Sequence, residues 1–156
     1  MKKQICSLLA ILALCSSFIS CEKEGNGDSS LVGTWLCVKE ETTMSDGTVL
    51  TYTDKSDWSF NSSSDTSFPY LLTFSSDGVI SGRTYLEVEG IPINYTMKSG
   101  YIYSLGIQCW KIVSNNGKTL VLELSDAQLE LTNIAQETLY PGTPLYVKSV
   151  ATYSKQ

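Results

Sequence analysis

Apolar and polar residues alternate over much of the chain after Leu31. Four apolar residues between Ile91 and Met97 are separated by polar residues or proline, and Leu120 to Leu124 carries a leucine at every second position. Similar alternation covers residues 80–88 and 128–132. Because successive side chains of a strand point to opposite faces, each of these runs predicts a half-buried β-strand.

Turn-forming residues separate the predicted strands. Asp-Gly or Asn-Gly pairs, the strongest short signal for a hairpin, stand at 46–47, 77–78 and 116–117. Gly90 and Ser99-Gly100 mark two more turns, and the Ser/Asp-rich stretch 55–67 predicts a long loop. The stretch from Ser125 to Leu139 is the best candidate for a helix, but Leu129 and Leu131 fit strand spacing better.

These patterns predict an all-β fold of about eight to ten antiparallel strands. A chain of this size with so many strands closes into a barrel or splits into a sandwich, because both arrangements hide strand edges. We expect an antiparallel meander closed into a barrel. About eight strands enclose either packed side chains or one small ligand.

The first 20 residues have a different pattern. Lys2 and Lys3 precede an apolar stretch from Ile5 to Ile19, which ends at Ser20 and an abruptly polar run. A charged start, a short apolar middle and a small residue at the end predict a cleaved secretory signal peptide over residues 1–20. The stretch is shorter than the roughly 20 apolar residues of a spanning helix.

The signal ends in Phe18-Ile19-Ser20-Cys21, which resembles the lipobox of bacterial lipoproteins. Phe18 departs from the usual aliphatic first position, whereas Ile19, Ser20 and Cys21 fit. The resemblance implies that Cys21 becomes the first mature residue and carries fatty acyl chains such as palmitate. Two or more chains attach a protein stably to a membrane. Residues 21–30 then form a flexible tether, too poor in apolar residues to fold.

The sequence Cys21-Glu22-Lys23-Glu24 looks like the short acidic export tag that some Gram-negative bacteria place after the lipidated cysteine. This resemblance implies an outer-membrane lipoprotein displayed on the cell surface. The alternative is a solvated tether on a lipoprotein that faces inward from the outer membrane.

Charge limits the partners of the mature chain. Loss of Lys2 and Lys3 leaves nine of the 11 basic residues against all 16 acidic ones, a formal charge of −7. Phosphate backbones repel such a chain, so we expect no nucleic-acid partner. We expect membrane attachment through the lipid on Cys21 rather than through the acidic body. The sequence identifies no protein partner.

Two segments resemble a known family. Leu31-Val32-Gly33-Thr34-Trp35 is similar to the Gly-x-Trp opening of lipocalin-like barrels, in which the tryptophan closes one end. The segment 71–78 (LLTFSSDG) looks like a strand and turn of small bacterial lipocalin-like lipoproteins. The resemblance implies one lipocalin-like domain over residues 31–156. It identifies a fold and leaves the function open.

The chain lacks the residues of most catalytic sites. It has no histidine, which excludes Ser-His and Cys-His nucleophiles and imidazole-metal sites. Paired carboxylates are the remaining option. Glu40/Glu41, Glu87/Glu89 and Asp54/Asp57 qualify by proximity alone. We therefore predict a protein that is not an enzyme and has no metal site, cofactor or catalytic residue.

Two cysteines, Cys37 and Cys109, remain after cleavage and lipidation. Export permits a disulfide between them, and closing so long a loop adds about 4–5 kcal/mol in the chain-entropy model. The alternative, which we favour, is two separate buried thiols packed as small hydrophobic side chains.

Aromatic residues offer two ways of binding. A barrel cavity for a small apolar or amphipathic ligand can be lined by Trp35, Phe74, Tyr95, Tyr101, Tyr103 and Trp110. The same alternation is expected if these side chains simply fill the barrel. The other hypothesis is a cell-envelope interaction protein, or an inhibitor, whose loops recognise a protein or glycan. Trp58, Phe60 and Phe68, in and beside the predicted loop, motivate it.

Overall fold

The structure, a computed structural model, describes residues 30–53, 68–83 and 90–156. Within these ranges it contains nine strands and one helix. They are β1 (Gly33–Met44), β2 (Val49–Tyr52), β3 (Leu71–Phe74), β4 (Val79–Arg83), β5 (Ile93–Lys98), β6 (Tyr101–Ser104), β7 (Ile107–Asn115), β8 (Thr119–Leu124), α2 (Asp126–Leu139) and β9 (Tyr146–Lys155). All strand pairs are antiparallel, which confirms the predicted fold class.

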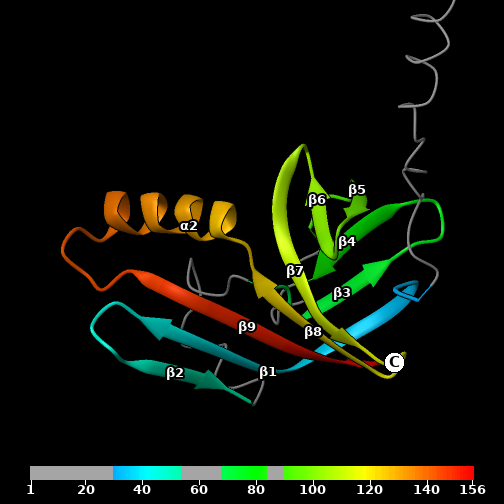
Figure 1. Cartoon of the computed structure of the whole chain (residues 1–156), viewed down its shortest axis with the longest axis horizontal. Helices are drawn as coiled ribbons and strands as arrows, with labels where there is room; N and C mark the ends of the chain where they lie inside the picture. The colour runs from blue at the N-terminus through cyan, green and yellow to red at the C-terminus, as the bar shows by residue number, and fades with distance from the viewer. Residues whose placement is uncertain (1–29, 54–67, 84–89) are drawn as a thin grey trace, which may run out of the picture.

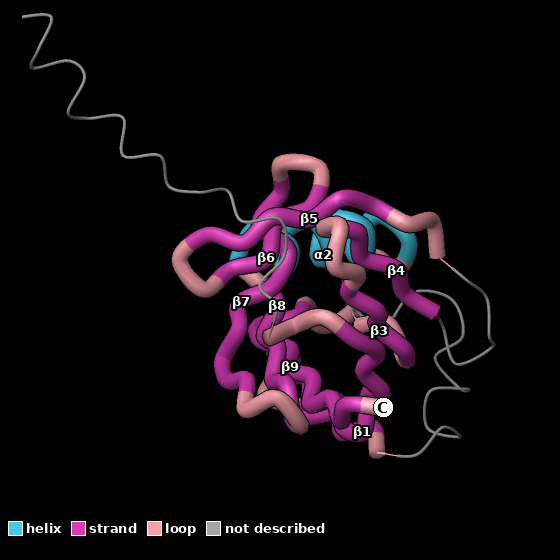
Figure 2. The backbone as a smooth tube through the Cα atoms, turned by 90° about the vertical axis from the view of Figure 1, so that its right-hand side faces the viewer, coloured by secondary structure: helices cyan, strands magenta, loops and turns pink. Residues whose placement is uncertain are grey.

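Eight of these strands close into a barrel. The order is β1-β3-β4-β5-β6-β7-β8-β9, and β9 pairs back with β1. Figure 1 shows β1 and β9 side by side, and their register runs from Trp35↔Lys155 to Met44↔Tyr146. The other edge of β1 pairs first with β3 and then with β2. The extra strand β2 therefore lies outside the closed ring. Figure 2 shows the strands of the ring in a view turned by 90° from Figure 1.

Four of the five predicted turns are present where their sequences placed them, and the predicted loop over 55–67 lies outside the described residues. Gly47, Gly78, Gly100 and Gly117 all have φ between 79° and 86°, a range that suits glycine because it has no Cβ. Ser99 before Gly100 also has a positive φ, so this pair forms the tight connection between β5 and β6.

A β-bulge in β1 changes which side chains face the interior. The register with β9 shifts between Cys37 and Lys39, which leaves Val38 as the extra residue. Before the bulge, Trp35 and Cys37 are buried; after it, the buried positions are Glu40, Thr42 and Met44. The bulge therefore turns the Glu40 carboxylate into the protein.

The stretch 126–139 is a helix, so the expectation of a strand around Leu129 and Leu131 was wrong. Ser125 caps the helix: its Oγ accepts a hydrogen bond from the Gln128 backbone nitrogen at 3.1 Å. In a helix these two leucines lie on nearly opposite faces. Leu129 packs against the core, whereas Leu131 remains 45% exposed.

Helix α2 lies beside the start of β9 (Figure 1). The Asn133 side chain bonds both backbone groups of Tyr146, donating to its carbonyl at 2.9 Å and accepting from its N–H at 2.7 Å. These bonds fix the helix against the strand although no helix residue is fully buried.

The strand predicted from Ile91 begins two residues later, at Ile93. Ile91 is 86% exposed and contributes nothing to the core. Proline at position 92 has no N–H to donate to a neighbouring strand, which accounts for the later start. The predicted inward positions Ile93, Tyr95 and Met97 do pack in or against the core.

Candidate functional site

A core of buried side chains lies inside the barrel. Trp35 and Tyr153 are fully buried, and the Trp35 Nε1 donates to the Leu31 carbonyl at 2.7 Å. The Lys155 ammonium lies 5.1 Å from the centre of the Trp35 ring, an attractive cation–π arrangement. Aliphatic side chains from the surrounding strands complete the core; they are Leu72, Ile80, Ile102, Leu120, Leu122 and Leu124.

The six aromatic residues proposed to line a cavity fall into two groups. Trp35, Phe74 and Tyr95 are buried in the core, and the rings of Phe74 and Tyr95 meet edge to face with centroids 5.1 Å apart. Trp110 is half-buried against the same core. Tyr101 and Tyr103 alternate with the buried Ile102 and Ser104, so they lie on the outer face.

Phe68 is buried and stacks on Trp110, with ring centroids 6.5 Å apart. It therefore belongs to the core and is not available on an exposed loop. Trp58 and Phe60 lie outside the described residues. The Trp110 Nε1 is shielded from solvent and has no hydrogen-bond partner in the described part of the chain.

A polar cluster lies where β1 and β9 pair beyond the bulge. The hydroxyls of Thr42 and Ser149 are 2.7 Å apart, and Ser149 donates to Glu40 Oε1 at 3.3 Å. All three side chains are buried. Burial, and after it the neighbouring Glu40 carboxylate, raises the pKa of the Cys37 thiol to about 12. Burial also raises the pKa of Tyr153 well above its usual range, with Cys37 and Glu40 adding to the effect.

The carboxylates proposed as a pair point in opposite directions. Glu40 faces the interior, whereas Glu41 is outside and pairs with Lys39 at 2.9 Å. The pairs Glu87/Glu89 and Asp54/Asp57 lie outside the described residues. Within the described ranges, no three Cys, Asp or Glu side chains are grouped so that they could hold a metal ion.

Cys37 and Cys109 are free thiols in this structure. Cys37 is buried on β1, while Cys109 on β7 is half-buried. Burial raises the pKa of the Cys109 thiol as well. Neither thiol has the lowered pKa of a reactive cysteine.

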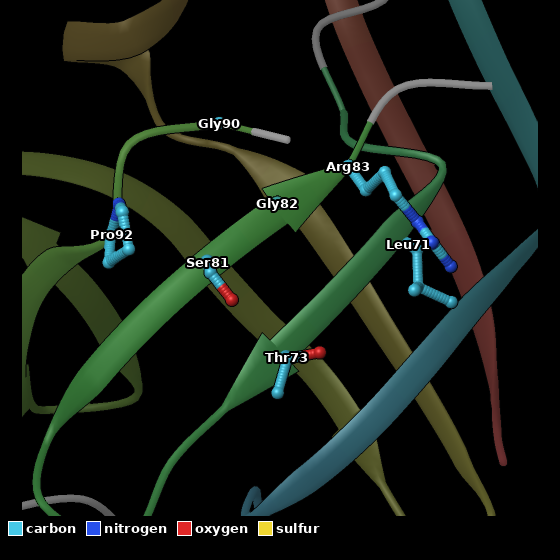
Figure 3. A pocket seen from close by; sticks show the side chains of 7 residues that line it. All are labelled: Leu71, Thr73, Ser81, Gly82, Arg83, Gly90 and Pro92. Atoms are coloured by element: carbon cyan, nitrogen blue, oxygen red, sulfur yellow. The ribbon is translucent and has the colours of Figure 1, made fainter. Parts of the chain in front are cut away.

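A groove of about 320 Å³ lies on the outer wall of the barrel over β3 and β4. Figure 3 shows the side chains that line it, among them Arg83 extending from the end of β4 toward Leu71. The register pairs Leu71 with Arg83 and Thr73 with Ser81, whereas the intervening Leu72 is buried inside. Gly82, Gly90 and Pro92 complete the lining. No sequence pattern indicates this site, because its residues are brought together by strand pairing.

Comparison with known protein families, curated proteins and solved structures finds no match for this chain. Among the described residues, no helix has both the length and the apolar character needed to cross a membrane.

Proposed function

We propose that this chain is an exported, lipid-anchored, non-catalytic recognition protein of the bacterial outer membrane. The N-terminal pattern supports the anchor: a signal peptide over residues 1–20, followed by Cys21 in a lipobox-like context. The barrel would act as a rigid body that presents its outer wall to a ligand or partner at the membrane. If the acidic residues after Cys21 act as an export tag, the protein faces the cell exterior. If they are only a solvated tether, it faces the periplasm.

The filled interior is the observation that favours recognition from outside. Trp35 and Tyr153 are buried at 0% exposure, and Phe74 and Tyr95 belong to the same buried core. Native cores are packed about as densely as organic crystals, so a ligand can enter such a region only by displacing these side chains. The outer groove over β3 and β4 needs no such displacement.

Replacing Cys21 with serine should abolish attachment of fatty acyl chains, because serine has no thiol to accept the diacylglycerol. Cells fed a palmitate analogue that can be tagged should label the wild-type chain and leave Cys21→Ser unlabelled, with that variant recovered outside the washed membranes. Cys15→Ser is the matched control and should label normally. Equal labelling of Cys21→Ser and the wild type would refute a lipid on this residue.

A small apolar or amphipathic ligand inside the barrel is the second candidate function. Its support is the Trp110 Nε1, a shielded donor without a hydrogen-bond partner in the described residues. Native proteins rarely leave such a group unsatisfied, and an acceptor on a bound ligand would satisfy it. Such a ligand would have to lie beside Phe68 and Trp110 rather than at the filled centre.

A further inference from the structure

We propose that the outer groove over β3 and β4 binds a small sugar acid, with the Arg83 guanidinium holding its carboxylate. The inference deepens the proposed function, since it rests on recognition from the outer wall. It does not depend on the lipid anchor.

Arg83 is the only arginine of the chain, and it lines the groove. Within the described residues no carboxylate pairs with it, although the chain holds 16 acidic residues. A guanidinium presents a planar fork of donors that matches a carboxylate with two parallel hydrogen bonds. Among the described residues, the groove therefore presents a guanidinium without a carboxylate partner on a protein that is otherwise acidic.

Hydroxyl groups cross the same wall in one row. Thr34 on β1 pairs with Thr73 on β3, and Thr73 pairs with Ser81 on β4. The Thr34 and Thr73 hydroxyls lie 3.2 Å apart, whereas the Ser81 hydroxyl makes no hydrogen bond within the described part of the chain. These groups can donate to and accept from the hydroxyls of a polyol beside Arg83.

The remaining lining is aliphatic and small. Leu71 and Pro92 offer carbon surface to the C–H groups of a ligand ring (Figure 3). The Gly90 N–H donates to the Gly82 carbonyl at 2.7 Å, which holds the segment before β5 against β4 as one side of the groove. A volume of about 320 Å³ is at the small end of ligand sites and suits a molecule of monosaccharide size.

Calorimetric titration of the full-length chain with D-glucuronate tests the proposal, with D-glucose as the neutral match. We expect glucuronate to bind and glucose to bind at least about tenfold more weakly, since one charge-assisted contact is lost. Arg83→Gln should weaken glucuronate binding by about tenfold to a hundredfold, and Arg83→Lys should restore part of it. Lys111→Gln removes the same charge from β7 and should bind like the wild type.

Absence of heat with glucuronate, equal binding of glucose, or wild-type affinity in Arg83→Gln would overturn the proposal. Inorganic sulfate binding as tightly as glucuronate would also overturn it, because the hydroxyl row would then play no part. Methyl glucuronide has the blocked anomeric oxygen of a glycan terminus. Binding of methyl glucuronide as tight as that of glucuronate would indicate the end of a glycan as the ligand, and weaker binding would indicate a free sugar acid. Failure of these titrations would leave palmitate labelling at Cys21 unaffected, so the groove and the anchor are tested separately.

Discussion

Replacing Trp35 with alanine should lower the free energy of unfolding by about 3–5 kcal/mol, as expected for removal of a large buried aromatic side chain. Trp35 has no exposed surface, and neighbours from several strands hold it in place. The change also leaves the Leu31 carbonyl without the donor that now lies 2.7 Å away. Urea unfolding followed by circular dichroism measures the loss.

Trp35→Phe is the matched control for this substitution. Phenylalanine keeps most of the apolar volume and loses the indole N–H, so its destabilisation should be clearly smaller than that of alanine. A loss below about 1 kcal/mol for Trp35→Ala would show that the ring does not fill the barrel. It would also remove the basis of the Gly-x-Trp resemblance.

Alkaline pH should destabilise the fold strongly, and Cys37 should account for much of the loss. Burial raises the pKa of this thiol from its ordinary 9.0 to about 12. Above pH 9.0 the unfolded chain releases the thiol proton while the folded chain retains it. The free energy of unfolding therefore falls as pH rises. Each pH unit above 9.0 lowers the free energy of unfolding by about 1.4 kcal/mol, and the total loss from this thiol reaches roughly 4 kcal/mol near pH 12.

Tyr153 acts in the same direction, since its pKa in the fold also lies well above the ordinary 10.0. Unfolding midpoints in urea, measured between neutral and alkaline pH, give the slope. Cys37→Ala should flatten the slope markedly, because it also removes one cause of the raised pKa of Tyr153. Cys109→Ala, at a half-buried thiol, should change the slope much less. An alkaline slope identical in Cys37→Ala and the wild type would contradict the buried position of Cys37.

Local signals in the sequence were enough to predict the class of fold. The glycines at 47, 78 and 117 carry the positive φ that their turns require, and the alternating residues around Tyr95 and Leu122 do face the core. Both signals act within a few residues, so they survive in a single sequence without knowledge of distant partners.

The helix could have been found from its beginning rather than from its apolar pattern. Ser125 followed by Gln128 three residues later is the signature of a capping box, and Ser125 does cap α2. Leu129 and Leu131 are two residues apart, which is the spacing of one face of a strand. Only Leu129 faces the core, however, so the exposed Leu131 was a misleading signal. Local capping chemistry was the better guide here.

Features that depend on strand pairing were not predictable. The bulge at Val38 reverses the phase of β1 and buries Glu40, yet nothing in the composition of that strand marks it. The groove around Arg83 has the same origin, since Leu71 and Arg83 become neighbours only through the register of β3 with β4. A period-two pattern predicts which side chains of a strand share a face. It does not predict which strand lies beside it or in which register the two pair.

Native mass spectrometry of the Cys21→Ser chain, gently extracted from cells, tests most directly whether the barrel is filled by its own side chains. With Trp35, Tyr153 and their neighbours occupying the interior, the mass should be that of the polypeptide alone. An apolar molecule retained at one copy per chain, and lost on unfolding, would contradict a barrel interior that is closed to ligands and would favour the ligand beside Trp110.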